Sequence, residues 1–181
     1  MARKETVTKT ILLEAAFAML KEEGIESVTA RKLATKANCS TQPIFRIYTG
    51  MEDLYADLYT MAVNFFNEYV EAFPRTTVVP FVNLGHSYIS FAQRNPQIFK
   101  FIFLTDNRYG RTLYDLVNGA NGNVTREIQA AKGQGATDPG GLFMKMWIFI
   151  QGAATMSLSG DYDLGDEETI SMLKDAYQSF K

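Results

Sequence analysis

The sequence is poor in the residue types that build metal centres and most catalytic sites. Its 181 residues include one cysteine, Cys39, and one histidine, His86. A single cysteine excludes an internal disulfide and is typical of a reducing cytoplasm. One histidine with no carboxylate or thiol three or four residues away offers no metal site, and no nucleophile–base pair stands out. We therefore expect neither a metal nor another cofactor, and we expect the protein not to be an enzyme.

Long apolar runs are also missing. The sequence has no run of eighteen uncharged apolar residues, and the N-terminus MARKETVTK lacks the apolar core of a signal peptide. No segment alternates convincingly between apolar and polar residues with the period of two that a half-buried strand requires. These absences predict an all-α protein without a membrane span, located in the cytoplasm.

The charge is divided unevenly along the chain. Residues 1–50 contain eight Lys/Arg and five Glu, a net charge of +3, whereas residues 51–181 contain ten Lys/Arg and fifteen Asp/Glu, a net charge of −5. A basic N-terminal segment on an otherwise acidic chain is typical of a segment that binds the phosphates of nucleic acid. We call residues 1–50 the head. We expect a DNA-binding domain over residues 1–50 and a helical ligand-binding and dimerisation domain over residues 51–181.

The stretch from Val28 to Tyr48 has the spacing of a helix-turn-helix. Thr29 is a good helix N-cap, with Val28 and Leu33 at the two positions of a hydrophobic staple. Asn38 tolerates the left-handed conformation that ends a helix, and Ser40 is expected to cap a second short helix. Helix, sharp turn and helix within about twenty residues is the pattern whose second helix enters the major groove of DNA.

The rest of the chain also has helical periodicity. We expect one long helix over residues 6–23, ended by Gly24, and another over residues 51–73. Further helices are predicted from Phe81, from Pro96, over 111–132 with an interruption near Gly119 and Gly122, after Pro139 and from Asp166. The glycine-rich segment 133–141 lacks the order of a phosphate-binding loop and is interpreted as a connector.

Over residues 9–59 the sequence resembles the TetR family of bacterial transcriptional repressors. The resemblance depends on TILLEAAFAMLKEEGIESVTARKLATKANCSTQPIFRIYTGMEDLY, and beyond residue 60 it is one of architecture only. It implies an α-helical homodimer that binds a near-palindromic double-stranded DNA operator and is released by a small-molecule effector. It also implies that the last two helices form the dimer interface. The DNA-binding residues expected on this basis are Lys9, Thr29, Arg31, Ser40, Thr41, Gln42, Pro43, Arg46 and Tyr48.

The sequence departs from the family pattern at four positions. Gln42 replaces a common glycine, and its side chain can read a base edge such as that of adenine. Phe45, Ile47 and Met51 replace residues that often contact phosphate in the family, and none of the three can donate a hydrogen bond from its side chain. We therefore expect a different operator preference. Arg46 is interpreted as a DNA contact, with a solvated surface residue as the alternative.

Aromatic and polar side chains of residues 51–181 are candidates for an effector site. They could surround an apolar ligand, although aromatic stripes at helical spacing also build plain cores. His86 is either part of such a site or a satisfied core residue, and Cys39 is expected to be a buried structural thiol rather than a redox switch. The ligand-binding residues that we expect are Phe65, Tyr69, His86, Phe91, Phe103, Trp147 and Gln151.

These observations predict a ligand-responsive DNA-binding transcriptional regulator. Repression, relieved by a small hydrophobic effector, is the expected mode of action. The alternative is an all-α small-molecule-binding or protein-interaction module with a vestigial DNA-binding head. This alternative stays open because Phe45, Ile47 and Met51 cannot donate hydrogen bonds to phosphate from their side chains.

Overall fold

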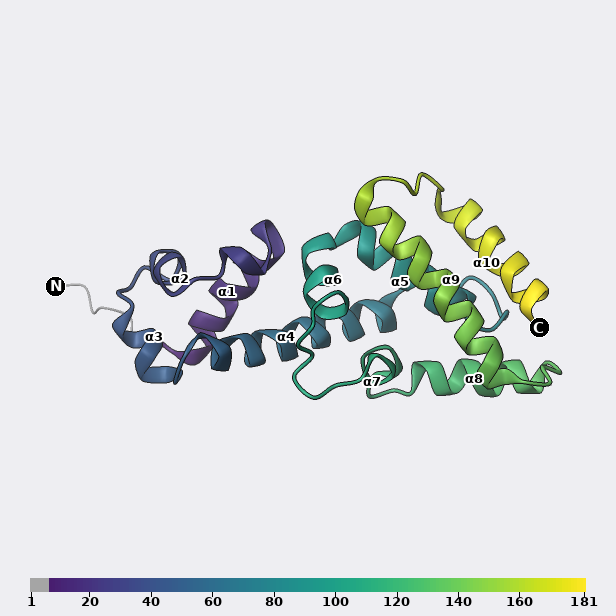
Figure 1. Cartoon of the computed structure of the whole chain (residues 1–181), viewed down its shortest axis with the longest axis horizontal. Coiled ribbons are helices and arrows are strands. Elements are labelled where there is room, and N and C mark those ends of the chain that lie inside the picture. Colours follow the sequence, from purple (N-terminus) through teal and green to yellow (C-terminus); the bar gives the residue numbers. More distant parts are fainter. Residues whose placement is uncertain (1–6) are drawn as a thin grey trace. The chain divides into compact units, whose positions relative to one another are not determined.

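The computed structural model describes residues 7–181, which contain ten α-helices and one turn of 3-10 helix and no strand. The predicted all-α class is therefore confirmed. The helices are α1 (Lys9–Glu23), η1 (Ile25–Ser27), α2 (Ala30–Lys36), α3 (Gln42–Ile47), α4 (Met51–Ala72), α5 (Val82–Arg94), α6 (Pro96–Phe103), α7 (Leu113–Asn118), α8 (Asn123–Gly133), α9 (Pro139–Ser159) and α10 (Asp166–Phe180). Figure 1 shows their order along the chain.

The chain forms two compact units. The first unit comprises the residues up to Phe65 together with Gln97–Gly110, and the second comprises Phe66–Pro96 together with Arg111–Lys181. Helix α4 contains residues of both units. The first unit thus includes the expected DNA-binding head but also part of α4 and most of α6, so the expected functional division at residue 50 stays a prediction.

The core of the head forms on one face of α1. Leu12, Ala16, Met19 and Leu20 are the buried residues of this helix, as their spacing predicts. The Thr8 side chain caps its N-terminus, and Gly24 ends it with a φ of 88°. Because residues with a side chain rarely adopt positive φ, glycine suits this position.

The turn between α2 and α3 is built by local hydrogen bonds. The Thr29 hydroxyl accepts the N–H of Lys32, as expected of an N-cap. Asn38 has a φ of 51°, and the N–H groups of Asn38 and Cys39 donate to the carbonyls of Thr35 and Ala34. This pattern is a Schellman motif, which confirms the predicted left-handed end of the helix.

The prediction that Ser40 caps α3 is wrong. The N-cap position is Thr41, which is already in the right-handed helical region (φ −70°, ψ −20°) and makes no side-chain cap bond. The cap prediction for Ser40 assumed that the helix begins one residue earlier. No side chain therefore accepts a hydrogen bond from the first backbone N–H groups of α3. Pro43, which has no N–H, lies in that first turn.

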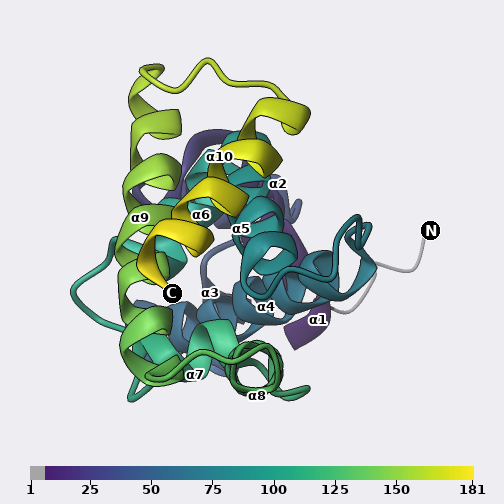
Figure 2. The same cartoon turned by 90° about the vertical axis from the view of Figure 1, so that its right-hand side faces the viewer.

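The second unit is organised around α5, which packs against both α9 and α10 (Figure 2). Every residue of α5 from Val82 to Ala92 is buried. On the α9 side the Tyr88 hydroxyl donates to Gln151 Oε1 at 2.7 Å, and the Tyr88 ring packs edge-on against Trp147. The interruption predicted near Gly119 and Gly122 separates α7 from α8, and both glycines have positive φ.

Candidate nucleic-acid interface and ligand cavity

Helix α3 exposes a continuous polar and aromatic surface. Gln42, Phe45 and Arg46 are exposed on it, and the ring of Phe45 is 53% exposed. Ile44 points to the opposite side and is 1% exposed, which anchors the helix in the first unit. An open hollow on α3 is lined by Gln42, Pro43, Phe45 and Arg46.

The basic side chains of the head divide into those that are already paired and those that are not. Lys32 and Lys36 form ion pairs with Glu23 and Glu22 at the end of α1. Lys9 lies 2.6 Å from Asp57 on α4 and 5.4 Å from the centre of the Tyr48 ring.

Arg31 and Arg46 are exposed and form no ion pair with any residue between 7 and 181. Their charges are therefore available to phosphates without the loss of an internal partner. Among the nine DNA-binding residues that the sequence predicts, these two have the least hindered cationic groups.

Tyr48 is placed differently from the other predicted DNA-binding residues. Its side chain is 3% exposed, and burial, followed by the nearby carboxylates of Asp57 and Asp53, raises its pKa to about 12. The ring thus belongs to the head core and has little surface to offer to DNA. The apolar periodicity of α3 contained this signal, since Tyr48 lies four residues after the buried Ile44.

The remaining predicted DNA-binding residues surround the helix-turn-helix. Thr29, Ser40 and Thr41 are exposed, and Pro43 is half-buried. Thr29 lies at the N-terminus of α2, where hydroxyl and backbone N–H groups can meet a phosphate. Cys39, expected to be buried, is half-buried in the turn.

Comparison with known proteins assigns this head. Residues 12–58 match the model of the bacterial regulatory proteins of the tetR family. The chain belongs to the TetR family. It is accordingly a DNA-binding transcriptional regulator and not an enzyme. A search of curated protein sequences finds no match.

Solved structures extend the similarity of this TetR-family regulator to the whole fold. A putative TetR-family regulator from Vibrio parahaemolyticus aligns with a TM-score of 0.67 at 16% identity, over 94% of this chain and 96% of that one. A TetR-family regulator from Haemophilus influenzae aligns with a TM-score of 0.63 at 18% identity, over 93% of each chain. Both share the helical second part as well as the head, and at this identity they show the fold alone.

The aromatic residues that the sequence predicts as a ligand site are not gathered around one cavity. Phe65 and Phe103 lie in the first unit, where they pack against Phe17 and Phe99. The others lie in the second unit, where the Tyr69 hydroxyl bonds to Ser90, and Trp147 and Gln151 contact Tyr88 as described above. Phe91 is fully buried among neighbouring rings.

His86 is a buried residue of α5, 6% exposed, with its Nε2 atom 2.9 Å from Asp166 Oδ1 at the start of α10. Its ring packs edge-on against Phe73 at 4.9 Å. The interpretation of His86 as a satisfied core residue fits these contacts. Within residues 7–181 no group of three or more His, Cys, Asp or Glu side chains is placed to hold a metal ion.

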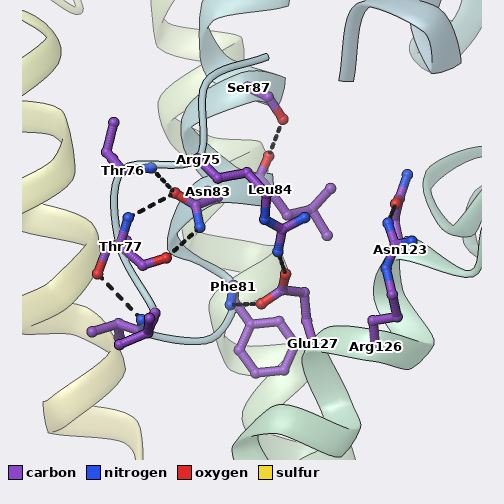
Figure 3. A network of polar contacts seen from close by, with 12 residues as sticks. Arg75, Thr76, Thr77, Phe81, Asn83, Leu84, Ser87, Asn123, Arg126 and Glu127 are labelled. Atoms are coloured by element: carbon purple, nitrogen blue, oxygen red, sulfur yellow. Dashed lines mark hydrogen bonds and ion pairs between the residues drawn. The ribbon is translucent and has the colours of Figure 1, made fainter. Parts of the chain in front are cut away.

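The second unit contains a cavity of about 310 Å³ with mostly polar walls (Figure 3). Its walls come from the end of α4, the loop after it, α5 and α8, and include none of the seven predicted ligand-binding residues. They are formed by Val70, Glu71, Phe73, Arg75, Asn83, Leu84, Ser87, Asn123, Arg126 and Glu127.

Two hydrogen-bonded groups build this cavity. Glu127 accepts two hydrogen bonds. Its Oε1 atom accepts one from the guanidinium of Arg75 (3.0 Å), and its Oε2 atom accepts one from the backbone N–H of Phe81 (2.7 Å). Asn83 accepts the N–H groups of Thr76 and Thr77 and donates to the Thr77 carbonyl, which fixes the loop between α4 and α5.

The ligand-binding residues expected from the sequence include none of these polar side chains, because the expectation depended on aromatic stripes. One available signal was the occurrence of Asn83, Asn123 and Glu127 at helix positions that are otherwise apolar. All three are less than 10% exposed. Buried polar side chains cost free energy unless they are bonded, and the three side chains here have bonded partners. Their position on one cavity makes it a candidate site.

The helices of residues 7–181 include none with the length and apolar character needed to cross a membrane.

Proposed function

We propose that this TetR-family regulator is a ligand-responsive repressor that binds a near-palindromic operator as a homodimer. The observation that carries the proposal is the exposed surface of α3, which includes Arg46, together with the exposed Arg31 of α2. Neither arginine forms an ion pair with any residue between 7 and 181. Helix α3 enters the major groove of each half-site, and the two arginines contact phosphates or base edges. Such a regulator acts in the cytoplasm, where it meets the chromosome.

The dimer forms through α9 and α10. Met144, Ile148 and Met156 recur at spacings of four and eight on α9 and are 54%, 67% and 48% exposed. A stripe of large exposed apolar side chains on a helix whose opposite face is buried supports a second copy of the chain as its occupant. A hollow on α10 that includes Met172 and Phe180 adds to this surface.

The effector acts by shifting a population. It must bind the DNA-incompatible arrangement of the protein more tightly than the competent one, because equal affinities would release nothing. The cavity of the second unit is the proposed effector site. The hydrophobic character predicted for the effector stays a prediction, and the polar walls of this cavity do not favour it.

A band-shift titration with the upstream region of its own gene tests the DNA-binding step. We expect a specific shift at low salt, and a slope of log K against log salt that falls by about 1 when Arg31 or Arg46 is replaced by alanine. Arg94→Ala removes an exposed arginine of the second unit and should leave the slope unchanged. In a reporter strain the protein should lower transcription from the bound promoter.

Two results would contradict this proposal. The absence of any specific shift at low salt would favour the alternative of a ligand-binding module with a vestigial head. An increase in transcription on adding the protein would assign it as an activator.

A further inference from the structure

We infer that the cavity of the second unit binds a small organic anion, such as a carboxylate with a short apolar body. This inference rests on the proposal that the second unit holds the effector, and it names the chemistry of that ligand. At about 310 Å³ the cavity lies at the lower end of the range for small-molecule sites, which limits the ligand to a small compound.

The hydrogen-bonding capacity left in the walls consists mainly of donors. Each guanidinium has five N–H groups. Arg75 uses one of its terminal nitrogens for Glu127, and Arg126 bonds to Asn123 and lies 3.5 Å from Glu71. The other N–H groups of the two arginines have no partner among residues 7–181, so the walls favour a ligand rich in acceptors.

The acceptors of the walls are largely occupied. Both oxygens of Glu127 are bonded, and its side chain is only 8% exposed. A cationic ligand would have to displace Arg75 from Glu127, because the backbone N–H of Phe81 already occupies the second oxygen of this carboxylate. The other carboxylate of the walls, Glu71, is 38% exposed and is already paired with Arg126 at 3.5 Å. An anion meets no such cost, since it can bind the free edges of the guanidiniums and leave the ion pair intact.

The two arginines come from different elements, and their side chains are accessible. Arg75 lies in the loop after α4 and its side chain is 63% exposed, whereas Arg126 lies on α8 and its side chain is 49% exposed (Figure 3). The planar fork of a guanidinium matches the geometry of a carboxylate, which lysine would not reproduce. Val70, Phe73 and Leu84 provide the apolar part of the walls, which suits a short hydrocarbon or ring next to the charged group.

A matched ligand series tests the inference without DNA. Benzoate, benzyl alcohol and benzylamine have nearly the same size and differ in charge. We expect benzoate to bind the whole protein at least tenfold more tightly than either of the others, by calorimetry at constant ionic strength, and to raise its Tm. Benzylamine binding more tightly than benzoate, or no binding by any of the three, would overturn the inference.

Variants locate the binding. Arg126→Gln should weaken the binding of benzoate at least fivefold. Arg126→Lys keeps the charge but lacks the planar fork of the guanidinium, and it should restore only part of this affinity. Arg94→Gln removes the same charge outside the cavity and should have no effect. Equal weakening by Arg94→Gln and Arg126→Gln would overturn the assignment, because it would mean that general charge attracts the anion.

A separate band shift distinguishes this inference from the proposed function. Benzoate that binds in an Arg126-dependent way but leaves an operator complex intact supports the anion site and counts against its role in release. An operator complex that is released only by uncharged or cationic compounds, together with no Arg126-dependent binding of benzoate, supports the regulator and overturns the anion site.

Discussion

The backbone N–H of Phe81 donates to the carboxylate of Glu127 across 46 positions of the sequence, at 2.7 Å. Phe81 itself has a φ of 65°, which is unusual for a residue with a side chain, and its ring is 1% exposed. The bond therefore fixes the start of α5 in a conformation that the local sequence does not favour.

Replacement of Glu127 by alanine should destabilise the second unit. The Phe81 N–H would be left buried and unpaired, which costs about 1–3 kcal/mol in the free energy of unfolding. Urea denaturation measures this loss. Glu127→Gln keeps an oxygen acceptor for the Phe81 N–H and removes the buried charge that needs Arg75, so it should cost less than about 1 kcal/mol. An equal loss in both variants would show that the ion pair, and not the backbone bond, is the main contribution.

Phe45 should read thymine methyl groups in the operator. Its ring is the largest apolar surface on α3, and the C5-methyl of thymine is the apolar group of the major groove. Replacing the contacted thymine by uracil should weaken binding about fourfold, since one buried methyl contributes about 0.8 kcal/mol. The Phe45→Ala variant should bind both operators equally while unfolding at the same urea concentration as the original chain. A variant that still distinguishes the two operators would assign the methyl contact to another residue.

Gly24 should not tolerate a side chain. Its φ is 88°, a conformation that residues with a side chain rarely adopt, so a substitution there is strained even if the flexible end of Gln97, 2.8 Å from a Cβ atom built there, moves away. Gly24→Ala is expected to lower the free energy of unfolding by about 1–2 kcal/mol. Gly50→Ala is the matched control, because Gly50 has ordinary φ and open space around its Cα. Thermal unfolding of the two variants compares them directly, and similar Tm values would argue against strain at Gly24.

Ile148→Asp should convert the dimer into monomers. The Ile148 side chain is 67% exposed on α9, and a carboxylate in a buried interface would lack a partner. Val78→Asp places the same charge on a side chain that is 88% exposed and lies outside α9 and α10, and it should leave the assembly unchanged. Sedimentation velocity measures the masses. A dimer that survives Ile148→Asp would locate the interface elsewhere.

Tyr48 should make stability depend on alkaline pH. Its pKa is raised to about 12 in the folded protein, against 10.0 for the unperturbed group. Between these values the unfolded chain has lost the proton and the folded chain has kept it, so the free energy of unfolding falls as the pH rises from about 10 towards 12. Tyr48→Phe removes this group, and the original chain should lose stability relative to the variant across that window. Parallel curves for the two proteins would contradict the assignment.

Local signals in the sequence were sufficient to predict the architecture of the head. Thr29 caps α2 and Asn38 ends it, because each depends on bonds to residues at most five positions away. The start of α3 was wrongly predicted because Ser40 and Thr41 are equally good cap residues by type. The outcome depends on where Ile44 and Tyr48 must lie to be buried, which a local pattern does not contain.

The cavity could not be predicted because its residues meet through long-range contacts. Arg75 and Glu127 are 52 positions apart, and their pairing depends on how α8 packs near the loop after α4. The aromatic residues, in contrast, have a clear helical period, which local sequence does contain. Their predicted role in ligand binding stays a prediction, and buried polar residues are the signal that indicates the proposed effector cavity.

The apolar side chains that α9 exposes also bear on how many copies of the protein a cell must hold. The proposed dimer, held by Met144, Ile148 and Met156, would dissociate on dilution, so its apparent stability would depend on protein concentration. When most copies are monomers, operator occupancy rises with the square of the concentration instead of linearly. The same helix face would therefore set a threshold number of molecules below which the operator is empty, whether or not the effector is present.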